Sequence, residues 1–196
     1  ARNAIRILTD RGCPVSVADL DPALGRAGHD RSFDRLAVKS LDELKFAINL
    51  FVLPPPTLAW LFQEFPGLLA GDRLNVALPM WELAILPPAW IEALQPLNVV
   101  VAQSHFIEHT FASHLPAALT VFAPSPLFLP DGIRPDRARF GLPDNAVVFV
   151  TGFEPHSDIQ RKNPFAVIEA FRRALDNSPR AHLIIKLNNA QSNGQT

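Results

Sequence analysis

Short apolar runs alternate with helix-like segments between Ile48 and Ala123, and this alternation constrains the fold more than any other feature of the chain. The runs read INLFVL, RLNVAL, LNVVVA and LTVFA, and the segments between them read PTLAWLFQEF, PPAWIEALQ and HFIEHTFASHL. Strands that are apolar along their whole length are typical of parallel sheets, whose crossover connections are usually helices. The pattern therefore predicts a doubly wound α/β fold, with a parallel sheet covered by helices on both faces.

The region before Ile48 has weaker signals. The spacing of Ile5 and Leu8 predicts a helix that ends at Gly12 as a C-cap, and PVSVADL at 14–20 predicts a strand. Residues 21–45 are mostly polar and irregular, although SLDELKFA could form a short helix capped by Ser40. We expect most of that stretch to be a loop.

A proline-rich segment at 124–145 interrupts the alternation and predicts a linker, with one short helix at DRARFGL. After it, AVVFVTGF predicts a strand, NPFAVIEAFRRAL a helix and AHLIIKL a second strand, which together make one βαβ unit. We therefore divide the chain into a domain at 1–123, the linker at 124–145, and the start of a second α/β domain at 146–196.

The overall composition limits the classes of partner. The net charge of −1 over 196 residues gives no global field that would recruit nucleic acid, so any anion site must be local. Cys13 stands alone, which excludes an internal disulfide, and every apolar stretch of membrane-spanning length contains a charge or a proline. We expect a soluble, cytoplasmic protein that does not bind nucleic acid.

Two adjacent cations, Arg161 and Lys162, stand between the strand AVVFVTGF and the helix expected to begin near Asn163. Cations beside a helix N-terminus are unfavourable by a few tenths of a kcal/mol up to about 1 kcal/mol, because they repel the positive end of the helix dipole. Two readings remain open at this point. The pair either binds an anion such as phosphate at the strand's carboxyl end, or consists of solvated loop residues.

The stretch FVTGFEPHSDIQRKNPFAVIEAFRRAL resembles the start of the C-terminal domain of retaining glycosyltransferases of the GT-B fold, the group 1 or family 4 class. Upstream, NVALPMWELAILPPAWIEAL followed by VVVAQSHF is similar to the N-terminal domain of the same family. The resemblance extends from about Arg2 to Leu187 and implies two Rossmann-like domains, the first lacking its first strand. It also implies transfer of a sugar from a nucleotide-diphosphate sugar donor to a glycan or lipid-linked acceptor.

The resemblance assigns candidate donor-binding residues. In that family a lysine before this helix contacts the donor diphosphate, and Lys162 matches it. An arginine usually lies about five residues earlier, where this chain has Ser157. Arg161 is therefore the candidate for the second cation, and Ser157 is the third donor-binding candidate. Fixed cations stabilise the negative charge that develops on the departing nucleoside diphosphate. We therefore expect neither a metal nor another cofactor.

The resemblance places the loop after RLNVAL on the acceptor side, near the anomeric centre of the sugar. Trp81 and Glu82 lie in this loop, and Glu82 is the candidate catalytic carboxylate. The alternative is structural, with Trp81 as an interior aromatic residue and Glu82 as a capping or salt-bridge residue.

Two other classes of function remain open. The run His105-Phe106-Ile107-Glu108-His109 spells H-x-x-E-H, a zinc-hydrolase motif whose histidines can share one helix face, but the chain offers no obvious third ligand. A non-catalytic α/β binding module is the other alternative.

The chain has no initiator Met and stops before the E-x7-E pair of the resembled family, so we expect an inactive fragment of a larger enzyme. For the parent protein we consider peripheral membrane association, and for this chain self-association through strand edges left open.

Overall fold

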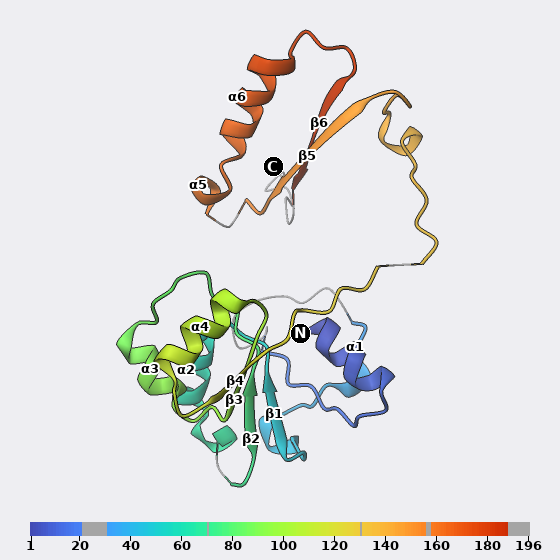
Figure 1. The fold of residues 1–196 in the computed structure, drawn as a ribbon. Coiled ribbons are helices and arrows are strands. Elements are labelled where there is room, and N and C mark those ends of the chain that lie inside the picture. The colour runs from blue at the N-terminus through green and yellow to red at the C-terminus, as the bar shows by residue number, and fades with distance from the viewer. Residues whose placement is uncertain (21–30, 70, 130, 156–157, 188–196) are drawn as a thin grey trace, which may run out of the picture. The chain divides into compact units, whose positions relative to one another are not determined.

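The computed structural model describes residues 1–20, 31–69, 71–129, 131–155 and 158–187, and it divides into two compact units (Figure 1). Unit 1 is Ala1–Leu129 and unit 2 is Pro130–Thr196. Both are α/β, as predicted, and the boundary between them falls inside the proline-rich segment at 124–145.

Unit 1 contains a four-stranded sheet in the order β1-β2-β3-β4, and every neighbouring pair is parallel. The strands are β1 Ile48–Phe51, β2 Leu74–Ala77, β3 Val99–Ala102 and β4 Leu119–Phe122. Each lies inside one of the apolar runs of the sequence, which confirms the predicted parallel sheet. The arrangement is compatible with a Rossmann-like domain.

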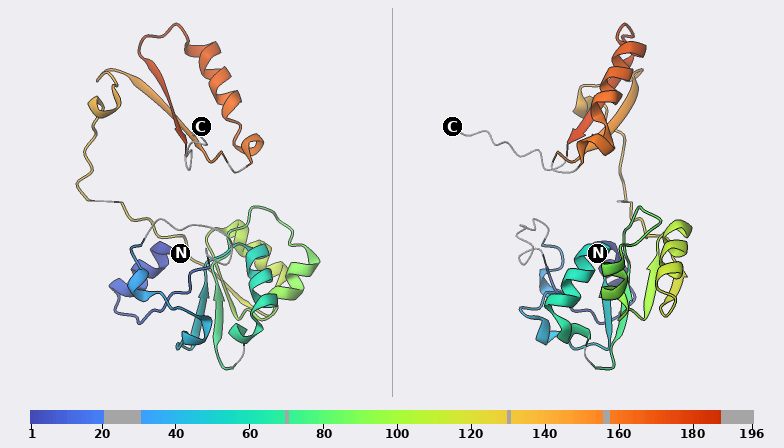
Figure 2. Two further views of the ribbon diagram at one scale, coloured as in Figure 1. Left: turned by 180° about the vertical axis from the view of Figure 1, so that it is seen from behind. Right: turned by 90° about the vertical axis from the view of Figure 1, so that its left-hand side faces the viewer.

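Three helices follow the first three strands and pack together on one side of the sheet (Figures 1 and 2). They are α2 Pro55–Glu64, α3 Pro88–Leu94 and α4 His105–His114, with a short 3-10 helix, η3 Pro66–Leu69, after α2. Proline in the first turn of α2 and of α3 fixes a helical φ where no amide donor is needed. The core between helices and sheet includes Leu58, Phe111 and Val100, all fully buried.

Two asparagines extend the buried face of the sheet, and each is satisfied by hydrogen bonds. Asn49 Nδ2 donates to the carbonyl of Leu68 at 2.8 Å and to Asn75 Oδ1 at 3.0 Å. Asn75 Nδ2 donates to the carbonyl of Pro96 at 3.2 Å. These bonds offset the cost of burying amides in the core, so the pair is structural.

The opposite face of the sheet is apolar but only partly covered by the described residues. Alternation along the paired strands places one set of side chains on it: Ile48, Leu50, Leu74, Val76, Val99, Val101, Leu119 and Val121. Ile48 is 59% exposed and Leu119 is 64% exposed. The expectation that helices cover both faces is therefore wrong within the described part of unit 1.

The first part of unit 1 departs further from the sequence expectations. Helix α1 spans Arg2–Asp10, and Gly12 beyond it has φ 72°, the left-handed geometry of a helix C-cap, as predicted. The predicted strand at 14–20 is wrong, because only a single parallel bridge forms there, between Val17 and Ala37. Apolar alternation alone cannot make a strand without a partner of matching length.

The short helix predicted at SLDELKFA reduces to a 3-10 turn, η2 Leu41–Glu43, which follows another such turn, η1 Asp34–Leu36. The Ser40 side chain makes no capping hydrogen bond, so its predicted role is wrong. The Glu43 carboxylate instead accepts a hydrogen bond from the Lys39 amide at 3.1 Å.

Unit 2 is one parallel β–α–β arrangement, as predicted. Its elements are η4 Ala138–Phe140, β5 Val147–Phe153, α5 Ile159–Lys162, α6 Pro164–Leu175 and β6 Ala181–Leu187. β5 and β6 pair along their whole length, and Phe171 of α6 meets Phe149 of β5 edge-on with ring centroids 5.7 Å apart.

Among the described residues of both units, no helix combines the length and the apolarity that a membrane span requires.

Candidate functional site

The candidate residues of unit 1 lie in the segments that follow β2, β3 and β4. Because these strands are parallel, their carboxyl ends meet at one edge of the sheet, where ligands of open α/β sheets bind. Trp81 and Glu82 follow β2, and Gln103, Ser104 and His105 follow β3.

Trp81 is half-buried and holds the loop after β2 against α3. Its Nε1 donates a hydrogen bond to the carbonyl of Ile85 at 3.2 Å, and its ring meets Trp90 edge-on at a centroid distance of 5.2 Å. Both rings pack against the core. These contacts support the alternative in which Trp81 is an interior aromatic residue.

Glu82, the neighbour of Trp81, is exposed to solvent. Within the described ranges, no hydrogen bond or ion pair joins its carboxylate to another residue. It therefore does not act as the capping or salt-bridge residue of the structural alternative. A free carboxylate at this edge is available to a ligand hydroxyl.

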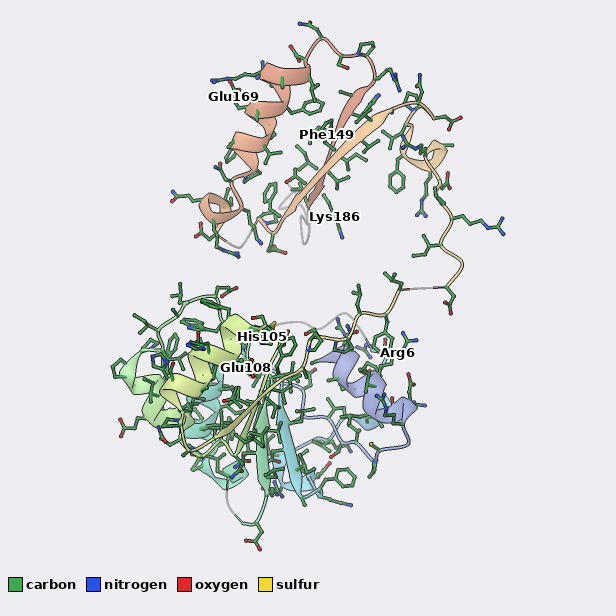
Figure 3. All side chains as sticks on the ribbon, in the orientation of Figure 1. Arg6, His105, Glu108, Phe149, Glu169 and Lys186 are labelled. Atoms are coloured by element: carbon green, nitrogen blue, oxygen red, sulfur yellow. The ribbon has the colours of Figure 1, made fainter. Side chains whose placement is uncertain are left out.

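The segment after β3 carries an ordered polar group, whose residues His105 and Glu108 appear among the sequence-based expectations only as part of a zinc motif. Ser104 Oγ accepts a hydrogen bond from the Ile107 amide at 3.2 Å and so caps α4. His105 Nδ1 lies 2.8 Å from Glu108 Oε2, and Figure 3 labels both side chains. The His105 ring also stacks on Phe122, with centroids 4.1 Å apart and planes 26° from parallel.

A second contact joins the ends of β3 and β4 next to this pair. Ser125 Oγ donates a hydrogen bond to Gln103 Oε1. The side chains of His105 and Gln103 therefore each contact a residue at or after the end of β4.

In the H-x-x-E-H run at His105–His109, two side chains of the motif pair with each other. His105 Nδ1 is engaged with Glu108, the acidic residue of the motif. Among the residues that the structure describes, there is no group of three His, Cys, Asp or Glu side chains able to hold a metal ion.

In unit 2, Arg161 and Lys162 do not stand in a loop before the long helix. They form the last turn of the short helix α5, which Asn163 ends with φ 45° and ψ 52°. Asn163 is also the N-cap of α6, since its Oδ1 accepts a hydrogen bond from the Ala166 amide at 3.3 Å. The two cations are thus favourably placed at the C-terminal end of α5, but they also lie directly before Asn163, the N-cap of the 12-residue helix α6, whose positive end repels them.

Few amides remain free at the start of α6. Pro164 has no N–H, and the amides of Ala166 and Val167 both donate to Asn163, to its side chain and to its carbonyl respectively. The start of α6 therefore offers few N–H donors to an anion. Binding would depend mainly on the two cations.

Both cationic side chains are exposed, and neither pairs with an acidic side chain in the described part of unit 2. Asp158 lies in the same turn, where its carboxylate accepts a hydrogen bond from the Arg161 amide at 3.2 Å and caps α5. Ser157, the third donor-binding candidate, lies outside the described residues.

Two surface hollows lie away from these residues. One of about 290 Å³ is lined by Val15, Ser16, Val38, Glu43, Lys45 and Phe46. Another of about 420 Å³ is lined by Ile7, Asp10, Arg11, Pro126 and Phe128. Neither includes any candidate site residue.

Comparisons with protein-family models, with curated proteins and with solved structures found no match to this chain.

Proposed function

We propose that the chain is part of a cytoplasmic retaining glycosyltransferase of the GT-B class, which transfers a sugar from a nucleotide-diphosphate donor to a glycan or lipid-linked acceptor. The observation that carries this proposal is the stretch FVTGFEPHSDIQRKNPFAVIEAFRRAL, whose resemblance to that family coincides with a parallel β–α–β arrangement. Two α/β units joined through a proline-rich segment also support it.

The donor diphosphate is bound by Lys162 and Arg161, with Ser157 as a further contact. Both cations are exposed and free of acidic partners among the described residues, so they can form charge-assisted hydrogen bonds to phosphate oxygens. Such bonds strengthen as negative charge develops on the departing nucleoside diphosphate. This chemistry needs no metal, and no nucleic acid takes part.

On the acceptor side, Glu82 is the residue placed to act on a hydroxyl. Its carboxylate is exposed and makes no hydrogen bond or ion pair in the described structure. Trp81 holds the loop that carries Glu82. In this proposal Glu82 is the catalytic-side carboxylate, and Trp81 positions the loop through its contacts with α3.

Calorimetric titration with pyrophosphate and with UDP, GDP and ADP tests the donor site. We expect Lys162→Ala to weaken diphosphate binding by tenfold or more, about 1.4 kcal/mol, because one charge-assisted contact is lost. Arg172→Ala is the matched control, since Arg172 is an exposed cation in the last turn of α6.

The control variant should bind as the unmodified chain does. If Lys162→Ala and Arg172→Ala have the same effect, the binding is non-specific attraction to cations. If the unmodified chain does not bind any diphosphate, Arg161 and Lys162 are solvated surface residues and the proposed function loses its donor site.

A further inference from the structure

The geometry points to His105 as a ligand-binding residue whose Nε2 accepts a hydrogen bond from a hydroxyl of a sugar acceptor at the carboxyl edge of the unit 1 sheet. The choice of a sugar as ligand rests on the proposed function. The arrangement of the side chain comes from the structure alone.

The position of His105 is fixed by the elements around it. The residue directly follows Ser104, the N-cap of α4, and comes three residues after the end of β3. The backbone there is held by the Ser104 cap and by the Gln103–Ser125 hydrogen bond to the segment after β4. The imidazole therefore stands at the edge where parallel sheets bind ligands.

Two contacts then orient the imidazole ring. Phe122, at the end of β4, stacks on one ring face at a centroid distance of 4.1 Å. Glu108 holds Nδ1 at 2.8 Å. A helix pair at this spacing contributes only a few tenths of a kcal/mol to a helix. Together, however, the stacking and the hydrogen bond select one ring orientation, as a binding residue requires.

The pairing with Glu108 also decides which nitrogen carries the proton. An ionised carboxylate only accepts hydrogen bonds, so Nδ1 must be the N–H donor. In the neutral ring Nε2 then has the free lone pair, because the hydrogen bond of one nitrogen sets the role of the other. The His105 side chain is 79% exposed, against 35% for Glu108. The ring is therefore open to a ligand while its partner is partly covered.

Hydroxyl groups are the donors that fit this acceptor. Gln103, two residues before His105, and its partner Ser125 carry further neutral polar groups. These groups donate and accept hydrogen bonds without a net positive charge. Such a set suits a neutral polyhydroxylated ligand better than a phosphate.

The test is nitrogen NMR of the neutral histidine side chains in the whole 196-residue chain. We expect His105 to show the Nδ1–H tautomer, and Glu108→Ala to abolish that preference. Adding methyl α-D-glucopyranoside or methyl α-D-mannopyranoside to about 100 mM should shift the Nε2 signal of His105.

His109 provides the matched control, because it is an exposed histidine on the same helix. Its signals should not move with the glycoside, and His109→Gln should leave binding unchanged. Glu108→Ala should weaken the glycoside response about threefold to tenfold, as loss of one positioned hydrogen bond predicts. His105→Gln should weaken it by a similar factor when binding is followed by signals of the neighbouring residues.

Three results would overturn the inference: an Nε2–H tautomer at His105, no shift of its signal with either glycoside, or equal shifts at His105 and His109. Pyrophosphate titration of the same sample separates this inference from the proposed function. Pyrophosphate binding without a glycoside response refutes the role of His105 alone. A glycoside response without pyrophosphate binding refutes the proposed donor site alone.

Discussion

Asn163 is the residue on which the geometry around Lys162 depends, and its substitution gives the sharpest stability prediction. It ends α5, begins α6, and is the one non-glycine residue with positive φ in the described part of the chain. Asparagine is among the few residues that tolerate this conformation, and its side chain also caps the Ala166 amide. The tolerance of a positive φ and the capping hydrogen bond therefore both contribute to stability at this one position.

Asn163→Ala and Asn163→Gly should differ in a way that separates these contributions. Alanine loses the cap, about 1 kcal/mol, and adds strain of about 1 kcal/mol at positive φ. Glycine loses only a few tenths as a cap and is unstrained at positive φ. We expect Asn163→Ala to destabilise unit 2 by about 2 kcal/mol, and Asn163→Gly to stay within about 0.5 kcal/mol of the unmodified chain.

Urea unfolding followed by two probes tests this prediction. The tryptophans, Trp60, Trp81 and Trp90, all belong to unit 1, so their fluorescence reports that unit, whereas far-ultraviolet circular dichroism includes unit 2. Asn163→Ala should shift the dichroism transition and leave the fluorescence transition in place. Equal destabilisation by alanine and glycine would refute the reasoning, because it would show that positive φ at residue 163 carries no strain.

Two further predictions concern packing and surface charge. Phe111→Ala should destabilise unit 1 by about 3 to 5 kcal/mol in tryptophan-monitored unfolding, because Phe111 is fully buried in the core. Phe106→Ala on the same helix, where the ring is 49% exposed, should cost much less, and similar losses would contradict the packing described. Arg173→Ala should cost no more than about 0.5 kcal/mol, since the 2.7 Å pair of Arg173 with Glu169 is exposed and screened by water. A loss above about 1 kcal/mol in dichroism-monitored unfolding would show that this ion pair is stronger than an exposed pair should be.

The strands from β1 onward could be predicted because each is a continuous apolar run between segments of helical period. The run at 14–20 is also predicted to be a strand, although it contains Pro14, Ser16 and Asp19, and it forms only the Val17–Ala37 bridge. Part of the difference lies outside the run itself. A strand needs a neighbour of suitable length and register, and that pairing is set by tertiary contacts that local pattern does not encode.

The group around His105 shows the same limit at the candidate site. Helical spacing was enough to place Glu108 within reach of His105, because residues three apart are neighbours on a helix. The stacking on Phe122 was not predictable, since it depends on the parallel pairing of β3 with β4 and on where each strand ends. A sequence motif can therefore identify the residues while leaving their partners undetermined.

The cations Arg161 and Lys162 lie between two helix ends, the C-terminal end of α5 and the N-terminal end of α6. At the end of α5 they interact favourably with the helix dipole, although a helix of four residues has only a small one. The 12-residue helix α6 begins directly after Asn163, and the positive end of its larger dipole opposes the same two cations. What still distinguishes them is that Asn163, in its left-handed conformation, turns the chain directly after Lys162, so both side chains stand at a fixed corner without acidic partners in the described structure. Because Asn163→Gly preserves that turn and Asn163→Ala strains it, diphosphate binding should survive the glycine substitution and weaken with alanine if the corner positions the cations. Equal binding by both variants would mean that any anion is held by the two charges regardless of their geometry.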